Sequence, residues 1–491
     1  MPKHLKVTSI KNPKIRHQNN SPVEDLYQYD QEHRDTIATV DAEGKRVWVY
    51  PKKPSGKYHR YHMGLTFVLL TIFFLGPFLK IGGQPFLLVN IFERRFVILG
   101  QAFWPQDFFI LAMAMVTFFL FVILFTTVFG RVWCGWACPQ TLFMEMVFRK
   151  VEYWIEGNAN QQRKLNQAPW GIQKIVKKVS KQIIFISIAL LISHTVMAYL
   201  IGIEKTIEIV TQPPSDNFKG FIGLVCFTGI FYWVFAWFRE QACIAVCPYG
   251  RLQGVLLGKN SLTVAYDWVR GEKRGKLKKG QVDQGNGDCI DCKLCVHVCP
   301  TGIDIRNGTQ LECVNCTACI DACDEVMLKV NKPTGLIRFA SYNSIKERVQ
   351  RLIDNRVIGY SIVLAGLVSL FTFFIVSRSD IDVTILKVPG TLYQQTEDGQ
   401  ISNLYNIQFI NKTFKDKQIK LRLNEPTKGL IEQVGDKGVL IKANDIYKGV
   451  FFIKMQQQNI QSAKTSVEIL LYENGRLVET ASTIFLGPVN N

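Results

Sequence analysis

The segment "CIDCKLCVHVCPTGIDIRNGTQLECVNCTACIDAC", residues 289–323, holds eight of the 13 cysteines of the chain. Its first part has the spacing C-x2-C-x2-C-x3-C-P, and its second part repeats C-x2-C-x2-C-x3-C. In bacterial ferredoxins with this spacing, three cysteines of each run bind one [4Fe–4S] cluster and the fourth binds the other cluster. The spacing therefore predicts a first cluster held by Cys289, Cys292, Cys295 and Cys323, and a second held by Cys313, Cys316, Cys319 and Cys299.

Structural zinc is the main alternative for this segment, because paired C-x2-C motifs also form zinc sites. The doubled order of eight cysteines favours iron–sulfur clusters instead. One position departs from many ferredoxins, since Asp324 and not proline follows the last cysteine, but this change removes no ligand. His297 lies between two predicted ligands, and we expect it to be a packing residue.

Two further cysteine pairs lie in "RVWCGWACPQT" and "REQACIAVCPYGR", each at the end of an apolar stretch, with matching cysteines 109 residues apart. This duplication predicts an internal repeat. Residues four apart share a helix face, so Cys134 with Cys138, and Cys243 with Cys247, can converge on one metal or redox site. Thiolates bind Cu(I), zinc and iron–sulfur units, which leaves the metal open. The alternative is two structural pairs of small residues at helix ends.

Other residues near these motifs have expected structural roles. Pro139 and Pro248 each suit the first turn of a new helix, where the missing N–H is not needed. Cys226 lies in an apolar run and is expected to be a core or lipid-facing residue. His59 and His62 are expected to mark membrane entry, with a haem or copper contact as the alternative. Three aromatic residues are expected to anchor the helices at the membrane interface: Trp133, Trp136 and Tyr249.

Hydropathy predicts a membrane protein. The chain has 491 residues, a mean hydropathy of +0.09 and 20% charged residues, which indicates both membrane and soluble parts. Apolar stretches long enough to span a bilayer occur at about 63–82, 107–129, 181–202, 218–238 and 357–377. Residues 83–104 are also apolar, but Glu93, Arg94 and Arg95 interrupt them, and charges are costly in lipid. We therefore expect an interfacial loop there.

The basic residues predict the orientation. Of the 58 Lys and Arg residues, 39 lie in 1–62, 131–181 and 239–356. Five spans that cross the membrane in turn place these three segments on the same side of it. Lys and Arg are retained on the cytoplasmic side, so the amino terminus and all the cysteine groups are expected in the cytoplasm. The carboxyl-terminal part is then expected on the other side of the membrane. The net charge of +18 has this membrane explanation, and no nucleic-acid partner is expected.

The predicted fold is a multi-pass α-helical membrane protein with five spans, an inserted bacterial-type two-cluster ferredoxin domain and a carboxyl-terminal immunoglobulin-like β-sandwich. Short alternating strands after the last span favour the sandwich. The polar amino-terminal arm is expected to be largely disordered. The predicted divisions are the cytoplasmic arm 1–62, the four-helix membrane domain 63–256, the ferredoxin domain 257–356, the fifth helix 357–378 and the periplasmic β-sandwich 379–491.

Several segments together resemble the FixG/RdxA/CcoG family of membrane polyferredoxins, which are accessory to cbb-type cytochrome c oxidase. They are "RVWCGWACPQT", "CIAVCPYGR", "RGEKRGK", "CPTGIDIRNG" and "LECVNCTACIDACDEVM". The resemblance implies a bacterial inner-membrane protein, with its carboxyl-terminal domain in the periplasm and two [4Fe–4S] clusters. It further implies a role in maturation of the oxidase and reduction of Cu(II) to Cu(I) for its copper centre. It also implies partners: membrane lipid, oxidase subunits or copper-delivery proteins, and an unidentified electron donor.

The leading hypothesis is that electrons pass from the clusters to copper at Cys134, Cys138, Cys243 and Cys247, which would make the chain a cupric reductase. A second hypothesis is a quinol-linked electron relay to a respiratory enzyme, as in the more distantly similar membrane ferredoxins of nitrate and nitrous-oxide respiration. A third is a non-enzymatic scaffold for oxidase assembly. The sequence has no Ser/His/Asp arrangement or phosphate-binding Gly loop, so hydrolysis and nucleotide-driven transport are not expected.

Overall fold

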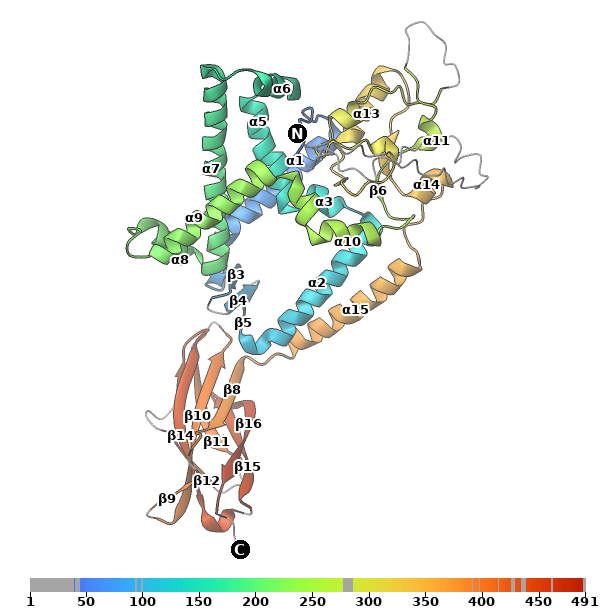
Figure 1. Cartoon of the computed structure of the whole chain (residues 1–491). Coiled ribbons are helices and arrows are strands. Elements are labelled where there is room, and N and C mark those ends of the chain that lie inside the picture. Colours follow the sequence, from blue (N-terminus) through green and yellow to red (C-terminus); the bar gives the residue numbers. More distant parts are fainter. Residues whose placement is uncertain are drawn as a thin grey trace, which may run out of the picture. The chain divides into compact units, whose positions relative to one another are not determined.

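The computed structural model describes residue 39 and residues 45–92, 95–98, 100–276, 286–390, 392–396, 398–413, 415–424, 429–433, 439–460 and 462–488. Most of the predicted disordered arm lies outside these residues, as do Glu93 and Arg94. The chain, shown in Figure 1, divides into two compact units. The first unit consists of Met1–Thr66, Phe125–Lys181 and Phe238–Val357, and the second of Phe67–Leu124, Gln182–Trp237 and Ile358–Asn491.

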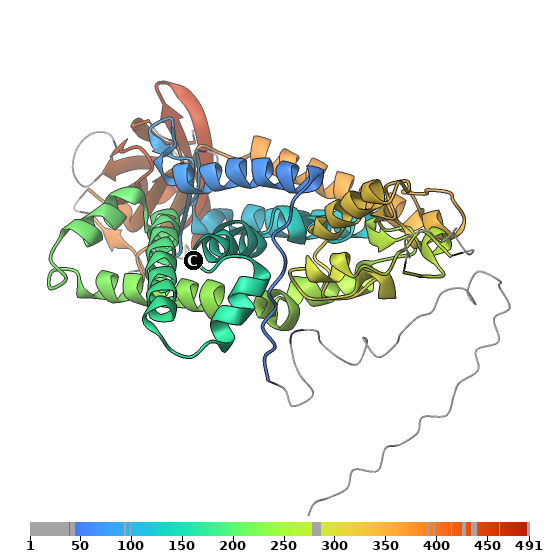
Figure 2. The same ribbon diagram turned by 90° about the horizontal axis from the view of Figure 1, so that it is seen from above.

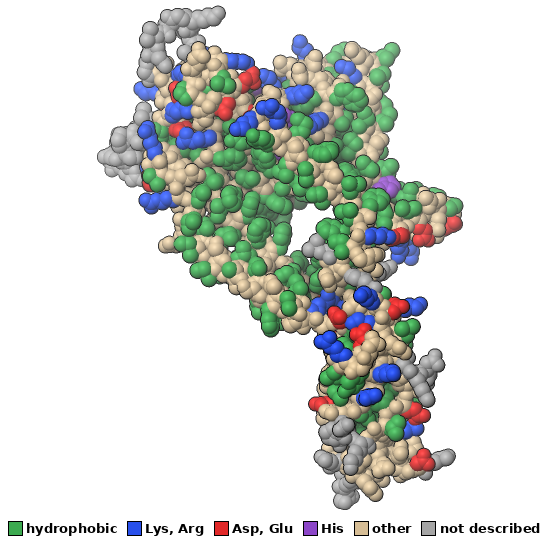
Figure 3. All heavy atoms as spheres, turned by 180° about the vertical axis from the view of Figure 1, so that it is seen from behind, with side chains coloured by type: hydrophobic (Ala, Val, Ile, Leu, Met, Phe, Trp, Pro, Cys, Tyr) green, Lys and Arg blue, Asp and Glu red, His purple; other side chains and the backbone are tan. Residues whose placement is uncertain are grey.

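Among the residues that the structure describes, five helical stretches are long and apolar enough to cross a membrane: Lys57–Phe78, Phe108–Phe129, Ile172–Ile201, Phe218–Phe238 and Asn355–Val376. They contain the helices α1 (Lys57–Leu75), α2 (Phe108–Phe129), α7 (Ile172–Ile201), α9 (Phe218–Tyr232) and α15 (Asn355–Val376), and the short helices η2 (Gly76–Phe78) and η5 (Trp233–Phe238). The five predicted spans are thereby confirmed. Figure 3 shows hydrophobic side chains covering the surface over α2 and α15, as expected of helices in contact with lipid. Cys226 is exposed on α9.

Short helices of the first unit carry the two C-x3-C-P motifs. They are α3 (Val132–Trp136), α4 (Pro139–Thr141), the π-helix η4 (Leu142–Phe148), α5 (Arg149–Ile155), α6 (Ala159–Gln167), the π-helix η6 (Ala242–Val246) and α10 (Pro248–Leu256). Pro139 and Pro248 begin α4 and α10, as predicted, and each follows a cysteine with extended backbone angles. The two prolines thus end one helix and begin the next at the same position in both halves of the repeat.

The ferredoxin part of the first unit surrounds a small apolar core. Its elements are β6 (Thr263–Tyr266), α11 (Trp268–Gly271), α12 (Leu294–His297), η7 (Ile305–Asn307), α13 (Ala318–Lys329), β7 (Ile337–Ala340) and α14 (Tyr342–Lys346). Strands β6 and β7 are antiparallel, and α12 packs against α13. Figure 1 labels α11, α13, α14 and β6, and Figure 2 shows the same part from above in yellow to gold. The buried core contains Val264, Tyr266, Cys289, Cys295, Ile305, Ile320, Met327, Leu336 and Ile337. Two predicted cluster ligands are therefore part of the core itself.

The segment predicted as an interfacial loop forms small sheets in the second unit. The short strands are β1 (Lys80–Ile81), β2 (Gln84–Pro85), β3 (Leu87–Asn90), β4 (Arg95–Ile98) and β5 (Gln101–Phe103), followed by η3 (Pro105–Asp107). Strand β3 pairs with β4 and β4 with β5, all antiparallel. Leu88, Val97 and Ala102 are buried, because alternate residues of these strands face inward. Helix α8 (Ile203–Thr211) belongs to the same unit.

The carboxyl-terminal residues form the predicted β-sandwich. One sheet has the strand order β12-β14-β10-β8, with β9 also paired to β10, and the other has the order β13-β11-β15-β16. Buried residues of both sheets form one core that includes Tyr405, Phe409, Phe451 and Phe485. The elements are β8 (Ile381–Lys387), β9 (Gln394–Gln395), β10 (Gln400–Asn411), β11 (Lys417–Leu423), β12 (Gly429–Gln433), β13 (Val439–Ile441), β14 (Ile446–Gln456), η9 (Gln457–Asn459), β15 (Lys464–Glu473) and β16 (Arg476–Leu486).

A buried ion-pair cluster joins the start of α2 to the sandwich within the second unit. Asp107, which is 5% exposed, binds Arg378 at 2.6 Å and Lys412 at 2.7 Å. Burial alone would raise the pKa of Asp107, but hydrogen bonds from Lys412, the Trp104 backbone and Arg378 hold that pKa below its usual value. The carboxylate therefore stays ionised and neutralises part of the buried positive charge.

Candidate metal centres

Four cysteines from both runs of the predicted ferredoxin motif line one cavity: Cys299, Cys313, Cys316 and Cys319. Cys299 follows α12, whereas Cys313 and Cys316 lie in the loop before α13 and Cys319 lies in α13 itself. The cavity also contains Cys295 and apolar side chains such as Val264 and Ile303. The chain thus brings together the set of thiols that the sequence predicts for the second cluster.

The two cysteine loops share an unusual backbone conformation. The residues on either side of the middle cysteine are left-handed in both runs, with φ of 51° for Asp291, 55° for Lys293, 55° for Asn315 and 65° for Thr317. Such angles are uncommon for residues other than glycine. Repeated left-handed residues turn the chain tightly around each middle cysteine, which lets three closely spaced thiols face one point.

The thiols predicted for the first cluster are also neighbours. The pKa of Cys323 is raised to about 12, chiefly by burial and also by the nearby Cys289 and Cys292 thiols. Burial raises the pKa of Cys295 as well, and Cys323 and Cys292 add to this effect. Cys289 and Cys295 are buried, but Cys292 is exposed. The fourth cysteine of the second run therefore lies with the first run, as the crossover pattern requires.

These two donor sets suit iron–sulfur clusters. Thiolates ligate iron in such clusters, and several buried thiolates repel each other unless cations lie between them. In the described part of the chain, no three side chains of His, Cys, Asp or Glu converge closely enough to hold a single metal ion. The assignment of individual ligands to each cluster stays a prediction.

The two C-x3-C-P motifs also bring their thiols together. Cys134 lies in α3 and Cys243 in η6, while Cys138 and Cys247 immediately precede α4 and α10. The pKa of Cys243 is raised to about 12 by burial and by the neighbouring thiols of the other three residues. The thiols are neighbours but no three of them converge tightly enough to hold a single ion in the described structure, so a soft metal or a redox group bound here would have to draw them closer together. We call Cys134, Cys138, Cys243 and Cys247 the four-thiol site.

A buried glutamine supports the four-thiol site. Gln253 of α10 is 0% exposed, and its Nε2 donates a hydrogen bond to the Cys134 Sγ at 3.2 Å. Burial raises the pKa of Cys134 to about 11, while the bond from Gln253 opposes this rise. Because Gln253 approaches from the second half of the repeat, it fixes the position of a thiol from the first half.

The four-thiol site lies directly against the loop that carries Cys313 and Cys316. Gly135 packs so closely on this loop that a Cβ at its position would lie 2.3 Å from the Val314 carbonyl oxygen. The Trp136 Nε1 donates to the Asn315 carbonyl at 3.2 Å. These contacts place the two thiol sets on opposite sides of one loop–loop interface. Electron transfer slows steeply with distance, so such an interface is a suitable path for electrons.

Arg131 occupies the same interface. Its side chain is 5% exposed, and its guanidinium donates to the carbonyls of Leu311 and Gly250. Its positive charge lowers the pKa of Cys134 and of Cys313, although burial holds both at about 11. One buried cation therefore stabilises negative charge on both thiol sets.

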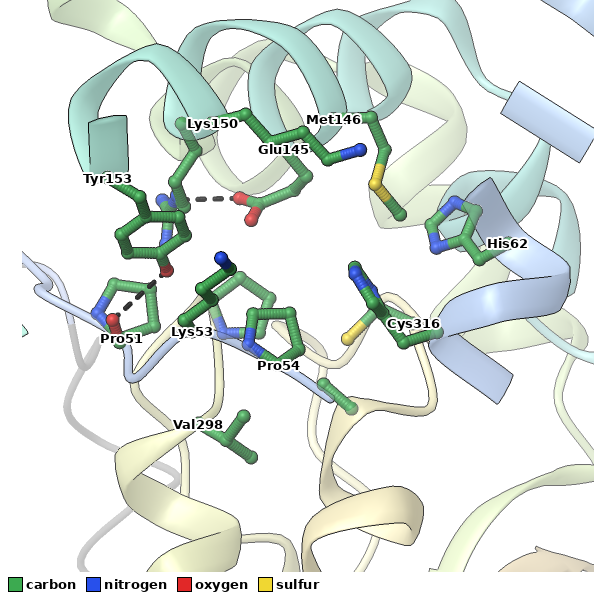
Figure 4. Close-up of a pocket in the computed structure, with 14 residues that line it drawn as sticks. Pro51, Lys53, Pro54, His62, Glu145, Met146, Lys150, Tyr153, Val298 and Cys316 are labelled. Carbon is green, nitrogen blue, oxygen red and sulfur yellow. Dashed lines mark hydrogen bonds and ion pairs between the residues drawn. The ribbon is translucent and has the colours of Figure 1, made fainter. Parts of the chain in front are cut away.

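A neighbouring pocket lies beside Cys316 (Figure 4). His62 is 3% exposed, lines this pocket and stacks on Trp136 with ring centroids 5.0 Å apart. Its Nε2 has no hydrogen-bond partner among the described residues. Met146 and Glu145 line the same pocket. His62 and Trp136 thus pack around the ferredoxin loop. The sequence predicted membrane entry for His62 and interfacial anchoring for Trp136, and it did not predict this packing.

Sequence reasoning named the cysteines but missed Arg131, Gly135 and Gln253. Gly135 and Arg131 lie inside the quoted motif "RVWCGWACPQT", and this position next to Cys134 is the feature of the sequence that could have identified them. Gln253 lies six residues beyond Cys247 and has no motif of its own. Its role is visible only because α10 packs against α3 through the bond to Cys134.

Comparisons with protein-family models match three parts of the chain. A 4Fe–4S dicluster domain matches residues 238–342, and a 4Fe–4S binding domain matches residues 111–159. The immunoglobulin-like fold found at the carboxyl terminus of FixG matches residues 371–488. These matches support iron–sulfur clusters in place of zinc and agree with the sandwich. The second match includes Cys134 and Cys138 of the four-thiol site.

Three known proteins are similar over most of their length. Protein RdxA of Cereibacter sphaeroides is 34% identical, over 77% of this chain and 82% of its own. Protein RdxB of the same organism is 35% identical, over 75% of this chain and 80% of its own. The nitrogen fixation protein FixG of Rhizobium meliloti is 31% identical, over 77% of this chain and 79% of its own.

Proposed function

Because the chain belongs to the FixG/RdxA family, we propose that this membrane iron–sulfur electron-transfer protein reduces Cu(II) to Cu(I) during assembly of a cbb-type cytochrome c oxidase. The observation that carries the proposal is the interface between Gly135 and Val314. It joins a ferredoxin loop to four thiols whose softness suits Cu(I).

The reaction transfers one electron to each Cu(II), which becomes Cu(I), and it forms or breaks no covalent bond in the protein. When bound, the [4Fe–4S] clusters supply one-electron donors beside the four-thiol site. Cys134, Cys138, Cys243 and Cys247 would bind the copper, and Gln253 would orient Cys134 through its hydrogen bond. Arg131 would stabilise negative charge at the interface.

Anaerobic reconstitution followed by a cupric-reduction assay tests this proposal. The full-length protein is reduced with dithionite, freed of excess reductant and mixed with Cu(II) and a chelator that absorbs light only when it binds Cu(I). Replacement of all four thiols of the site by serine is expected to abolish the rapid formation of the coloured Cu(I)–chelator complex. The matched control is Cys226→Ser, which removes an exposed thiol on α9. Full activity in the four-serine variant would refute the proposal.

A further iron–sulfur cluster at the four-thiol site is the second candidate. The match of a 4Fe–4S binding domain to residues 111–159 favours it, because this range contains half of the thiols. Iron analysis distinguishes the two candidates. Two clusters correspond to about eight iron atoms per chain, and a third raises this to about twelve, with a loss of four in the four-serine variant.

The proposed orientation places the amino terminus and all thiol sets in the cytoplasm and the sandwich in the periplasm of the bacterial inner membrane. The distribution of Lys and Arg supports it. The proposed partners are membrane lipid, an electron donor, and oxidase subunits or copper-delivery proteins that receive Cu(I). A membrane-impermeant maleimide tests this orientation. It is expected to label single cysteines introduced at exposed positions of the sandwich in intact cells, and labelling only after lysis would contradict the proposal.

A further inference from the structure

A cleft of about 740 Å³ lies next to the first cluster loop in the first unit. Its walls come from residues 50–55, from the beginning of α6 and from α12. The Lys52 amide donates to the His297 carbonyl at 2.8 Å, which joins the first of these segments to α12. The cleft is therefore built from three segments that are far apart in the sequence.

The charged side chains that line this cleft are basic. Lys52, Lys53 and Arg163 are exposed and line it together with His297, and among the described residues no Asp or Glu does so. None of these four side chains forms an ion pair with another described residue. A carboxylate that interacts with Lys52, that of Glu325, is itself bound to Lys329 at 2.5 Å. The described residues of the cleft thus present a net positive charge to solvent.

The cleft adjoins the exposed edge of the first cluster loop. Leu294 lines the cleft and lies two residues after Cys292, the exposed member of its set of thiols. The intervening Lys293 is also exposed and adds a further positive charge. Electrons that enter the protein from solution need a redox group close to the surface, and Cys292 is the exposed cysteine among the predicted cluster ligands.

We propose that this basic cleft docks an acidic, soluble one-electron carrier protein, which delivers electrons beside Cys292. In each encounter the carrier loses one electron and this protein gains one, and no bond or proton transfer is required. A carrier protein fits better than a nicotinamide nucleotide, because the nucleotide gives up a hydride with two electrons. Exposed cations attract an acidic partner at long range and orient it before contact. The inference rests on the electron-transfer function and is independent of copper.

The test uses an acidic bacterial flavodoxin as the probe. The full-length, cluster-containing protein in detergent is mixed in a stopped-flow instrument with flavodoxin hydroquinone, and bleaching of the cluster absorbance gives the second-order rate constant. The triple variant Lys52→Glu, Lys53→Glu and Arg163→Glu is expected to react about tenfold more slowly or worse. The control variant Lys259→Glu, Arg348→Glu and Arg351→Glu reverses three exposed charges elsewhere in the unit and is expected to change the rate less than twofold.

Binding is measured separately from electron transfer. The anisotropy of the flavin in oxidised flavodoxin is expected to rise on addition of the wild-type protein and the control variant, but not of the triple variant. The wild-type rate is also expected to fall at least about tenfold between 20 and 500 mM salt, because salt screens exposed charges. The salt dependence is measured on the wild-type protein alone, so it does not depend on whether a variant folds.

Equal rates for the triple and control variants, or a wild-type rate that does not respond to salt, would overturn the docking proposal. Reduction of Cu(II) after chemical reduction by dithionite does not use the cleft and should be the same in all variants. Loss of that reaction in the wild-type protein would refute the copper function and leave the docking result standing.

Discussion

Replacement of Gly135 by alanine tests the interface between the two thiol sets. Gly135 is buried in α3, and its position leaves no room for a side chain because the backbone of Val314 and Asn315 lies against it. An added Cβ would lie 2.3 Å from the Val314 carbonyl oxygen and 2.9 Å from the Asn315 carbonyl carbon. The obstructing atoms belong to the backbone, so rotation of a flexible side chain cannot relieve the overlap.

The magnitude follows from the size of the overlap. Ordinary contacts of this kind are 3.4–4 Å, so the two loops must separate by about 1 Å at this point. Overpacking of a buried site costs about 1–3 kcal/mol, and alanine recovers about 0.5–1 kcal/mol relative to glycine in a helix. The net cost of roughly 0.5–2 kcal/mol corresponds to an increase of about 2- to 30-fold in the population of locally opened interface.

Hydrogen–deuterium exchange of the full-length protein measures this opening directly. Peptides that cover residues 311–317 are expected to exchange about 2- to 30-fold faster in Gly135→Ala. The matched control is Gly171→Ala, since no atom lies within 4 Å of the Cβ position at Gly171. Unchanged exchange in residues 311–317 of the Gly135 variant would refute the packing argument, and so would equal acceleration in the control.

Four further predictions concern buried polar groups. Arg131→Met removes a cation that acts on both thiol sets, so reduction of the second cluster is expected to require a lower potential in an EPR redox titration; an unchanged potential would contradict this. Gln253→Leu removes a hydrogen bond to a thiol and is expected to weaken Cu(I) binding about 10- to 100-fold in competition with a chelator; unchanged affinity would argue against the proposed copper site. Asp107→Asn removes the carboxylate that binds both Arg378 and Lys412; Lys412 keeps its ion pair with Asp382 at 2.6 Å, so the substitution is expected to cost about 1–3 kcal/mol in unfolding of the sandwich, compared with little change for the exposed Asp398→Asn. Because the pKa of Asp107 is lowered in the folded protein, its stabilisation is present above about pH 4 and is lost as the pH falls further; equal unfolding free energies of the wild type and the Asn variant at pH 7 would contradict the assignment.

The cysteine spacing and the apolar stretches were sufficient to predict the main features of the chain. Three thiols with two-residue gaps are expected around one cluster because the backbone of a short loop limits where they can go, and the left-handed residues at Asn315 and Thr317 agree with this. Likewise, a stretch of about 20 apolar residues needs no distant partner to be recognised as a span. The small sheet at residues 87–103 was missed because its strands are short and charged residues interrupt them.

The sequence alone predicted the two sets of cluster thiols and determined the five spans and the sandwich, because each depends on a local pattern of spacing or alternation. Only the tertiary structure decided that Gly135 lies against Val314, that Gln253 binds Cys134 and that Lys52 and Arg163 line one cleft. These pairs are separated by more than 100 residues in the chain, and their contacts arise from the packing of whole loops and helices. No periodic pattern records such packing, so the path between the thiol sets became visible only in the folded protein.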